Sequence, residues 1–285
     1  MTGGTGIAAG SLAATAREGE PDRYLAALLA PPAARAGLLA LAAFAGELAR
    51  IPLLVTREPA MGEIRLQWWR DALGQPAGTR TGHPVADALR DAVDRHGLPH
   101  ALLLDAIDAR AADLLPDPLA DDAALDAYLW RTEGALFALA GHILGAKPEG
   151  DMQAAAAAGA RAYGLARLLL GLPHALSRGR VPLPLARLDD AGVRPEELLA
   201  GTGGPEIESV LASLRAEARA DLATSRQHVA KLPRSVRPAF LPLALVPSYL
   251  RALERAGGHP LREPAEIAPL TRVCRIAAAH WLGRP

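Results

Sequence analysis

The sequence predicts an all-α fold, because apolar residues recur with a helical period along the chain and because its composition favours helices. Half of the 285 residues are hydrophobic and only 4% are aromatic. Ala and Leu dominate, and no stretch alternates between apolar and polar residues as a half-buried strand would. A chain of this length can bury one large core. We therefore expect one helical bundle of about ten helices.

Proline, glycine and capping residues divide the first half of the chain. A helix opens at Pro31-Pro32, and its apolar residues are spaced by three and four until Pro52 closes it or starts its last turn. The next helices are expected from Gly62 through the Trp-Trp pair, from His83-Pro84 to about His96, from Pro99 to about Leu115, and from Asp121 or Asp122, as the N-cap, through Leu144.

The second half is organised in the same way. Lys147-Pro148-Glu149-Gly150 breaks the chain, and an alanine run then leads into a long apolar helix that ends near Leu176. Pro195 starts a short helix, residues 201–204 form a linker, and further helices are expected over 205–231, 236–256 and 265–282. No linker is long enough for two domains, so residues 1–20 are expected to be a flexible N-terminus and residues 21–285 one domain.

Charge and cysteine content exclude several classes of function. The net charge is zero, which argues against nucleic-acid binding, and the single cysteine, Cys274, excludes an internal disulfide. Residues 1–14 lack the pattern of a signal peptide. The longest uncharged runs, 134–146 and 238–250, are shorter than the roughly 20 residues that span a bilayer. A cytoplasmic location is expected, with a peripheral contact with the inner membrane left open.

Three sequence motifs indicate a family. Residues 43–50 read Ala-Phe-Ala-Gly-Glu-Leu-Ala-Arg, residues 64–69 read Ile-Arg-Leu-Gln-Trp-Trp, and residues 177–184 read Ser-Arg-Gly-Arg-Val-Pro-Leu-Pro. Together they resemble the squalene/phytoene synthase family, whose members join two prenyl diphosphates head to head. The resemblance extends from Asp22 to Leu253. It implies an isoprenoid-synthase-type helical bundle around a central apolar cavity.

The carboxylates that this chemistry requires are missing. The family's enzymes hold Mg²⁺ between aspartates on two facing helices to stabilise the leaving diphosphate. The first aspartate group, Asp-Asp-x-x-Asp, is replaced here by Ala49, Arg50 and Leu53. Counting back without gaps from Gly179-Arg180 places Gly171 and Ala175 at the two aspartates of the second group. The resemblance therefore implies the fold with both metal-binding motifs degenerate, and no metal or other cofactor is expected.

Within the family, the same motifs are similar to a degenerate branch that includes mitochondrial assembly factors of respiratory complex I and their bacterial relatives. This similarity implies a non-catalytic pseudoenzyme that assists assembly of respiratory complex I or a related membrane process. Its expected partner is a protein client, either a respiratory complex subunit or another assembly factor.

Two groups of residues are candidates for the remaining functional roles. Substrate or anion binding is assigned to Arg50, Arg167, Arg178 and Arg180, because a guanidinium can hold phosphate without metal. The alternative for Arg178 and Arg180 is that they complement a helix dipole. A pocket or partner surface is assigned to Phe44, Glu47, Arg65, Gln67, Trp68 and Trp69. For the two tryptophans, packing in the core is the favoured alternative.

Two alternative functions stay open. The first is an active prenyl diphosphate condensing transferase of the phytoene or squalene synthase type, in isoprenoid biosynthesis. It would need Mg²⁺ and other carboxylates in the cavity, of which Glu47, Glu63 and Asp71 are the nearest candidates. The second is a protein that binds an isoprenoid or quinone in the former substrate channel.

Overall fold

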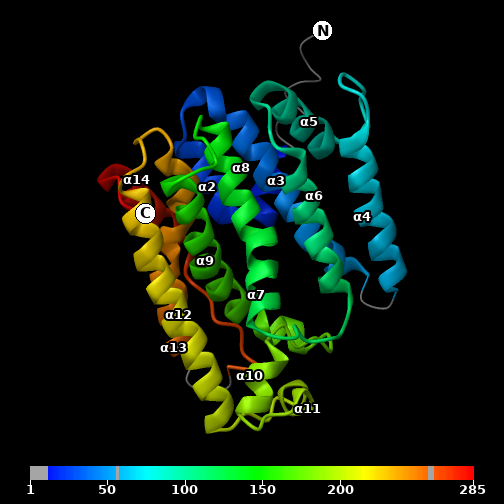
Figure 1. Ribbon diagram of the computed structural model, residues 1–285, viewed down its shortest axis with the longest axis vertical. Helices are drawn as coiled ribbons and strands as arrows, with labels where there is room; N and C mark the ends of the chain where they lie inside the picture. Colours follow the sequence, from blue (N-terminus) through cyan, green and yellow to red (C-terminus); the bar gives the residue numbers. More distant parts are fainter. Residues whose placement is uncertain (1–11, 56–57, 256–259) are drawn as a thin grey trace.

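The computed structural model describes residues 12–55, 58–255 and 260–285, and no β-strand occurs in them. Its α-helices are α2 (Pro21–Leu29), α3 (Pro32–Leu54), α4 (Pro59–Gly74), α5 (Pro84–His96), α6 (His100–Ala109), α7 (Asp122–Leu129), α8 (Ala135–Ile143), α9 (Asp151–Leu176), α10 (Leu185–Asp190), α11 (Pro195–Leu199), α12 (Pro205–Val229), α13 (Val246–Arg255) and α14 (Pro269–Leu282). Figure 1 shows α4 at one edge of the bundle and α12 at the opposite edge. The all-α prediction is confirmed.

Local signals in the sequence set several helix boundaries. Helix α5 begins at Pro84 after the capping residue His83, and it ends at Gly97, whose φ of 64° is the left-handed conformation that favours glycine. Helix α7 is capped by Asp121, whose carboxylate accepts a hydrogen bond of 2.8 Å from the backbone N–H of Ala124. The expected N-cap in this acidic stretch is therefore confirmed.

Three stretches predicted as continuous α-helix change their winding. Residues Trp130–Gly134 form a π-helical turn between α7 and α8, and 3₁₀ segments cover Arg110–Leu114 after α6 and Arg237–Leu245 before α13. In the π turn, the indole ring of Trp130 occupies the position where a Cβ on Gly134 would lie. A sequence period of 3.6 residues does not reveal packing of this kind, so the sequence pattern alone predicts a continuous α-helix across the π-helical turn.

Helix α3 lies at the centre of the bundle and packs against α2, α4, α5 and α8. It is long and apolar enough to cross a membrane by length and composition. Within the domain, however, its side chains Leu41, Phe44 and Leu48 are at most 2% exposed. Burial of this degree is typical of a core helix. The other long pair, α9 and α12, packs side by side at the opposite edge from α4 (Figure 1).

Two glycines correct the predicted boundaries. Residues 12–19 are helical, and a Cβ on Gly19 would lie 2.6 Å from the Cα of Gly46 on α3. Residues 12–19 are thus packed against the core, which corrects the expectation of a flexible segment over 1–20; residues 1–11 lie outside the described part. Gly62 lies inside α4 rather than before it, and there a Cβ would lie 2.5 Å from the side chain of Leu114.

Candidate functional site: an arginine-lined cavity

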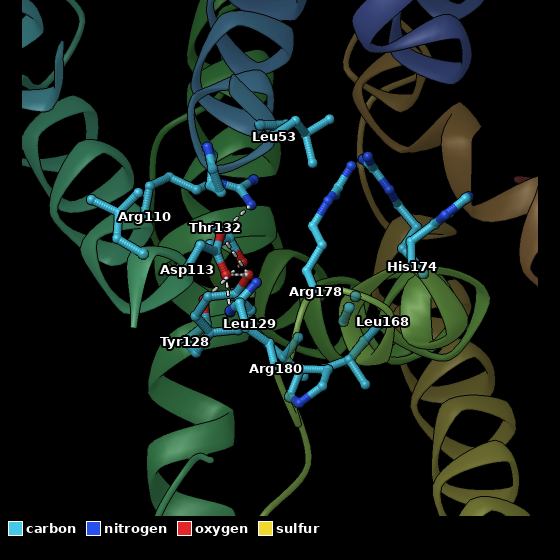
Figure 2. A pocket seen from close by; sticks show the side chains of 18 of the residues that line it. Leu53, Arg110, Asp113, Tyr128, Leu129, Thr132, Leu168, His174, Arg178 and Arg180 are labelled. Atoms are coloured by element: carbon cyan, nitrogen blue, oxygen red, sulfur yellow. Dashed lines mark hydrogen bonds and ion pairs between the residues drawn. The ribbon is translucent and has the colours of Figure 1, made fainter. Parts of the chain in front are cut away.

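A cavity of about 650 Å³ lies between α3, the turn that joins α7 to α8, α9 and the loop that follows α9 (Figure 2). Its apolar wall is formed by Pro52, Val55, Leu114, Leu129, Leu168 and Pro182. Its polar wall holds the guanidinium groups of Arg110, Arg167, Arg178 and Arg180 and the carboxylates of Asp113 and Glu133. The space is within the range of small-molecule sites, which are mostly apolar with a few convergent polar groups.

The positions that the resemblance assigns to the family's two aspartate groups face one another across this cavity. Ala49 and Leu53 line it from α3, and Gly171 and Ala175 line it from α9. Arg50 does not line it: its side chain is half exposed and pairs with Glu47 at 3.4 Å. Of the four arginines expected to bind an anion, the structure therefore brings three together and leaves Arg50 on the outer surface.

Asp113 is the centre of one polar cluster in the cavity. Its carboxylate accepts hydrogen bonds from the hydroxyl of Tyr128 at 3.0 Å, from Arg110 at 3.1 Å and from Arg180 at 2.8 Å. Burial, together with the adjacent Asp113 charge, raises the pKa of the Tyr128 hydroxyl above its ordinary value. Arg180 is also bound to the backbone carbonyl of Leu115 at 3.2 Å. The loop that follows α9 and carries Arg178 and Arg180 is thus fixed to the 3₁₀ segment after α6.

Glu133 belongs to a second, buried cluster. Its carboxylate pairs with Arg23 at 2.6 Å and with Arg167 at 3.4 Å, and Arg167 also binds both carboxylate oxygens of Glu20, at 2.7 and 2.9 Å. Burial would raise the pKa of Glu133, but Arg167 and Arg23 outweigh it and lower that pKa. For Glu20, burial prevails, and with the nearby Glu133 charge it raises the pKa. Two carboxylates thus share two guanidinium groups.

Arg178 differs from the other arginines of the cavity. Its side chain is exposed, and among the described residues it has neither an acidic partner nor a side-chain hydrogen bond. Figure 2 shows it extending beside His174 and away from the cluster around Asp113. Because four guanidinium groups face two carboxylates here, the cavity carries an excess of positive charge. Such an arrangement attracts an anion.

The carboxylates of the cavity do not fit the Mg²⁺ cluster that the family would imply. Magnesium prefers free carboxylate oxygens together with substrate phosphates, whereas Asp113 and Glu133 are each held by two guanidinium groups. The substitute ligands considered from the sequence, Glu47, Glu63 and Asp71, do not line the cavity. Across residues 12–55, 58–255 and 260–285, no three His, Cys, Asp or Glu side chains gather as a metal site.

A second cavity of about 410 Å³ lies on the other side of Arg167, next to Asp22. The carboxylate of Asp22 accepts hydrogen bonds from the hydroxyls of Tyr163, at 2.6 Å, and Tyr249, and it pairs with Arg272 at 2.7 Å. These residues lie far apart in the sequence, and no spacing pattern connects them. This cluster could therefore not be predicted from the sequence.

The residues assigned to a pocket or partner surface separate into two groups. Phe44 and Trp69 are buried and pack edge to face with their ring centroids 5.2 Å apart. Their assignment to a surface is therefore corrected, since both belong to the core. Arg65, Gln67 and Trp68 lie on the outer face of α4, where Trp68 is 39% exposed. None of the six residues lines the large cavity, although Glu47, Arg65, Gln67 and Trp68 stay accessible.

Comparisons with known proteins agree with this architecture. The family model for squalene/phytoene synthase matches residues 16–273. A rat protein, NADH dehydrogenase (ubiquinone) complex I, assembly factor 6, is 30% identical over 90% of this chain and 78% of its own length. A phytoene synthase from Thermus thermophilus is 31% identical over 69% of this chain and 66% of its own length.

A solved dehydrosqualene synthase, described as in complex with a ligand, shares the fold. Its TM-score is 0.80 at 17% sequence identity, over 96% of this chain and 95% of that one. Because the family model covers nearly the whole described chain, the family assignment does not depend on any single motif. The chain belongs to the squalene/phytoene synthase family.

Proposed function

We propose that this protein is a non-catalytic assembly factor for a complex I-type NADH:quinone oxidoreductase, built on the squalene/phytoene synthase fold. One observation carries the proposal. At the positions that the resemblance assigns to the family's two metal-binding groups, the cavity is lined by Ala49, Leu53, Gly171 and Ala175. These side chains cannot hold Mg²⁺, and the carboxylates nearby are already neutralised by arginine.

Walls of this kind leave the charge that develops on a leaving diphosphate without a metal ion to stabilise it. A metal ion stabilises developing charge on a leaving group by several kcal/mol, and each ~1.4 kcal/mol changes a rate about tenfold. Without the metal, the ionisation of an allylic diphosphate loses several orders of magnitude in rate. The sequence comparisons support the assembly role, because the rat assembly factor matches more of the chain than the phytoene synthase does.

The cavity has a part in this proposal as a metal-independent anion site. Arg178 is free of acidic partners in the described chain, and Arg180 is fixed beside it by Asp113. Guanidinium groups bind phosphate oxygens directly and strongly in such partly enclosed places. The apolar residues that line the same cavity, among them Leu53 and Leu168, are suited to a hydrocarbon chain. We infer an amphiphilic anion as the ligand. Binding of an isoprenoid through its charged head group is the second function that this cavity favours.

Two experiments test the assembly role. Deleting the gene in its source organism should lower NADH:quinone oxidoreductase activity and the amount of assembled complex on native gels, and the wild-type gene should restore both. The purified protein should not condense farnesyl or geranylgeranyl diphosphate in the presence of Mg²⁺. Condensation at an enzymatic rate, or a deletion strain with normal complex, would refute the proposal.

The anion site is tested by calorimetric titration with inorganic pyrophosphate, with and without Mg²⁺. We expect the same affinity in both conditions, and a loss of about tenfold or more in Arg178→Ala, since a charge-assisted hydrogen bond contributes about 1.5–3 kcal/mol. Arg50→Ala is the matched control, because Arg50 lies outside the cavity. Binding that requires Mg²⁺ would mean that a metal site exists and would revive the synthase alternative.

A further inference from the structure

Helix α14 turns an apolar face away from the domain. Its buried residues are Ile276 and Ala279, which face α2 and the 3₁₀ segment Arg237–Leu245. On its outer side, Leu270 is 71% exposed and Trp281 is 81% exposed. From Leu270 onward, the exposed residues of this helix are Leu270, Val273, Cys274, Arg275, Ala278, Trp281 and Leu282, and Arg275 is the one charged residue among them; Ala277 is half-buried on the same side.

Four of these residues form one continuous stripe. Leu270, Cys274, Ala277 and Trp281 are separated by four, three and four positions, a spacing that places them on one side of a helix. With a rise of 1.5 Å per residue, the stripe is about 16 Å long. Leu282, which is 73% exposed, extends it at the C-terminal end of the helix. Large exposed apolar surfaces of this kind mark interaction sites.

The charged side chains on the helix itself are positive, and the nearest acidic residue before it along the chain is Glu266. No Asp or Glu occurs over residues 267–285. Arg275 and Arg284 are exposed, and Arg234 borders a groove that Trp281 and Leu282 also line. Among the described residues, none of these three arginines forms an ion pair with a carboxylate. They are therefore available to a negatively charged partner.

We propose that the outer face of α14 docks onto the surface of an anionic lipid bilayer. Interfacial helices bury an apolar face just below the head groups, with Trp at the boundary and basic residues directed toward the head groups. The stripe with Trp281 at its end, together with the arginines beside it, meets these requirements. A protein partner with a mixed surface would gain nothing from the absence of acidic residues, whereas an anionic membrane attracts every arginine near it.

Helix α14 is held for this role by its inner face. Arg272 pairs with the buried carboxylate of Asp22 at 2.7 Å, so the helix is anchored to α2 while its outer side stays accessible. Docking needs no unfolding or detachment of the helix. Docking through this face is independent of the proposed assembly role, because the outer face of α14 lines neither of the two cavities described above.

The test is flotation of the purified full chain with vesicles of phosphatidylcholine that contain phosphatidylglycerol. We expect binding to these vesicles and much weaker binding to phosphatidylcholine alone. The double substitution Leu270→Ser with Trp281→Ser should lower binding by about tenfold or more, because two large apolar side chains no longer enter the lipid. Ile64→Ser is the matched control: Ile64 is 61% exposed on α4, on another face of the domain.

The charge contribution is tested separately with Arg275→Glu combined with Arg284→Glu. This variant should bind anionic vesicles at least about tenfold more weakly, and added salt should weaken the wild type in the same direction. Absence of wild-type flotation would overturn the proposal. So would sedimentation showing a wild-type dimer that Trp281→Ser converts to a monomer, because the stripe would then be covered by a second copy of the chain.

Discussion

Replacing Asp22 with Ala should destabilise the fold strongly, because one buried carboxylate connects four helices. It accepts hydrogen bonds from Tyr163 on α9 and Tyr249 on α13, and it pairs with Arg272 on α14. The substitution leaves two buried hydroxyls without an acceptor, at about 1–3 kcal/mol each. The pair with Arg272 adds less, since that arginine is partly exposed. Relief of the desolvation of Asp22 offsets part of the loss, so we expect a decrease of about 3–5 kcal/mol in the free energy of unfolding.

The assay is urea unfolding followed by circular dichroism at the helical minimum, with linear extrapolation to water. Tyr249→Phe removes one hydroxyl and should cost about 1–2 kcal/mol by itself. In the Asp22→Ala background, the same change should cost almost nothing, because its hydrogen bond is already lost. A loss below about 1 kcal/mol for Asp22→Ala, or additive effects of the two substitutions, would refute this account of the cluster.

Three further outcomes follow from other contacts. Burial lowers the pKa of His96, with smaller contributions from the charges of its neighbours, so the unfolded state binds a proton first and the free energy of unfolding should fall as the pH drops below 6.5. His96→Asn should make the free energy of unfolding less dependent on pH between about pH 7.5 and 5.5. An unchanged pH dependence in this variant would exclude His96 as its source. Gly62→Val should lower the free energy of unfolding in urea by about 1–3 kcal/mol, since the added Cβ would lie 2.5 Å from the side chain of Leu114. A neutral effect would show that Leu114 can move. Asp121→Ala should cost about 1 kcal/mol by loss of the cap to Ala124, and Asp121→Asn should retain most of it.

Much of the helix order could be predicted from the sequence, because the residues that begin and end these helices act through local contacts. Pro84 and Gly97 bound α5, and Asp121 caps α7, through contacts within a few residues. Tertiary packing decided what local signals could not. Gly62 was interpreted as a residue preceding a helix, whereas it is a packing position against Leu114 within the helix.

The candidate site shows the same division. The family pattern, counted back from Gly179-Arg180, singled out Arg167 and placed Ala49 and Gly171 on two facing helices, and all three line the cavity. Arg50 is next to Ala49 in sequence but 100° away on the helix, so it points outward and pairs with Glu47. The cluster around Asp22 depends on contacts between distant segments and left no pattern in the sequence.

Arg167 lies between the two cavities. It lines both cavities, and its guanidinium neutralises Glu20 toward one and Glu133 toward the other. A ligand that draws this group to its own side weakens the compensation of the carboxylate on the opposite side, which then depends on Arg23 alone. Filling one cavity therefore changes the charge that the other offers, so the two cavities are coupled through the position of one guanidinium group.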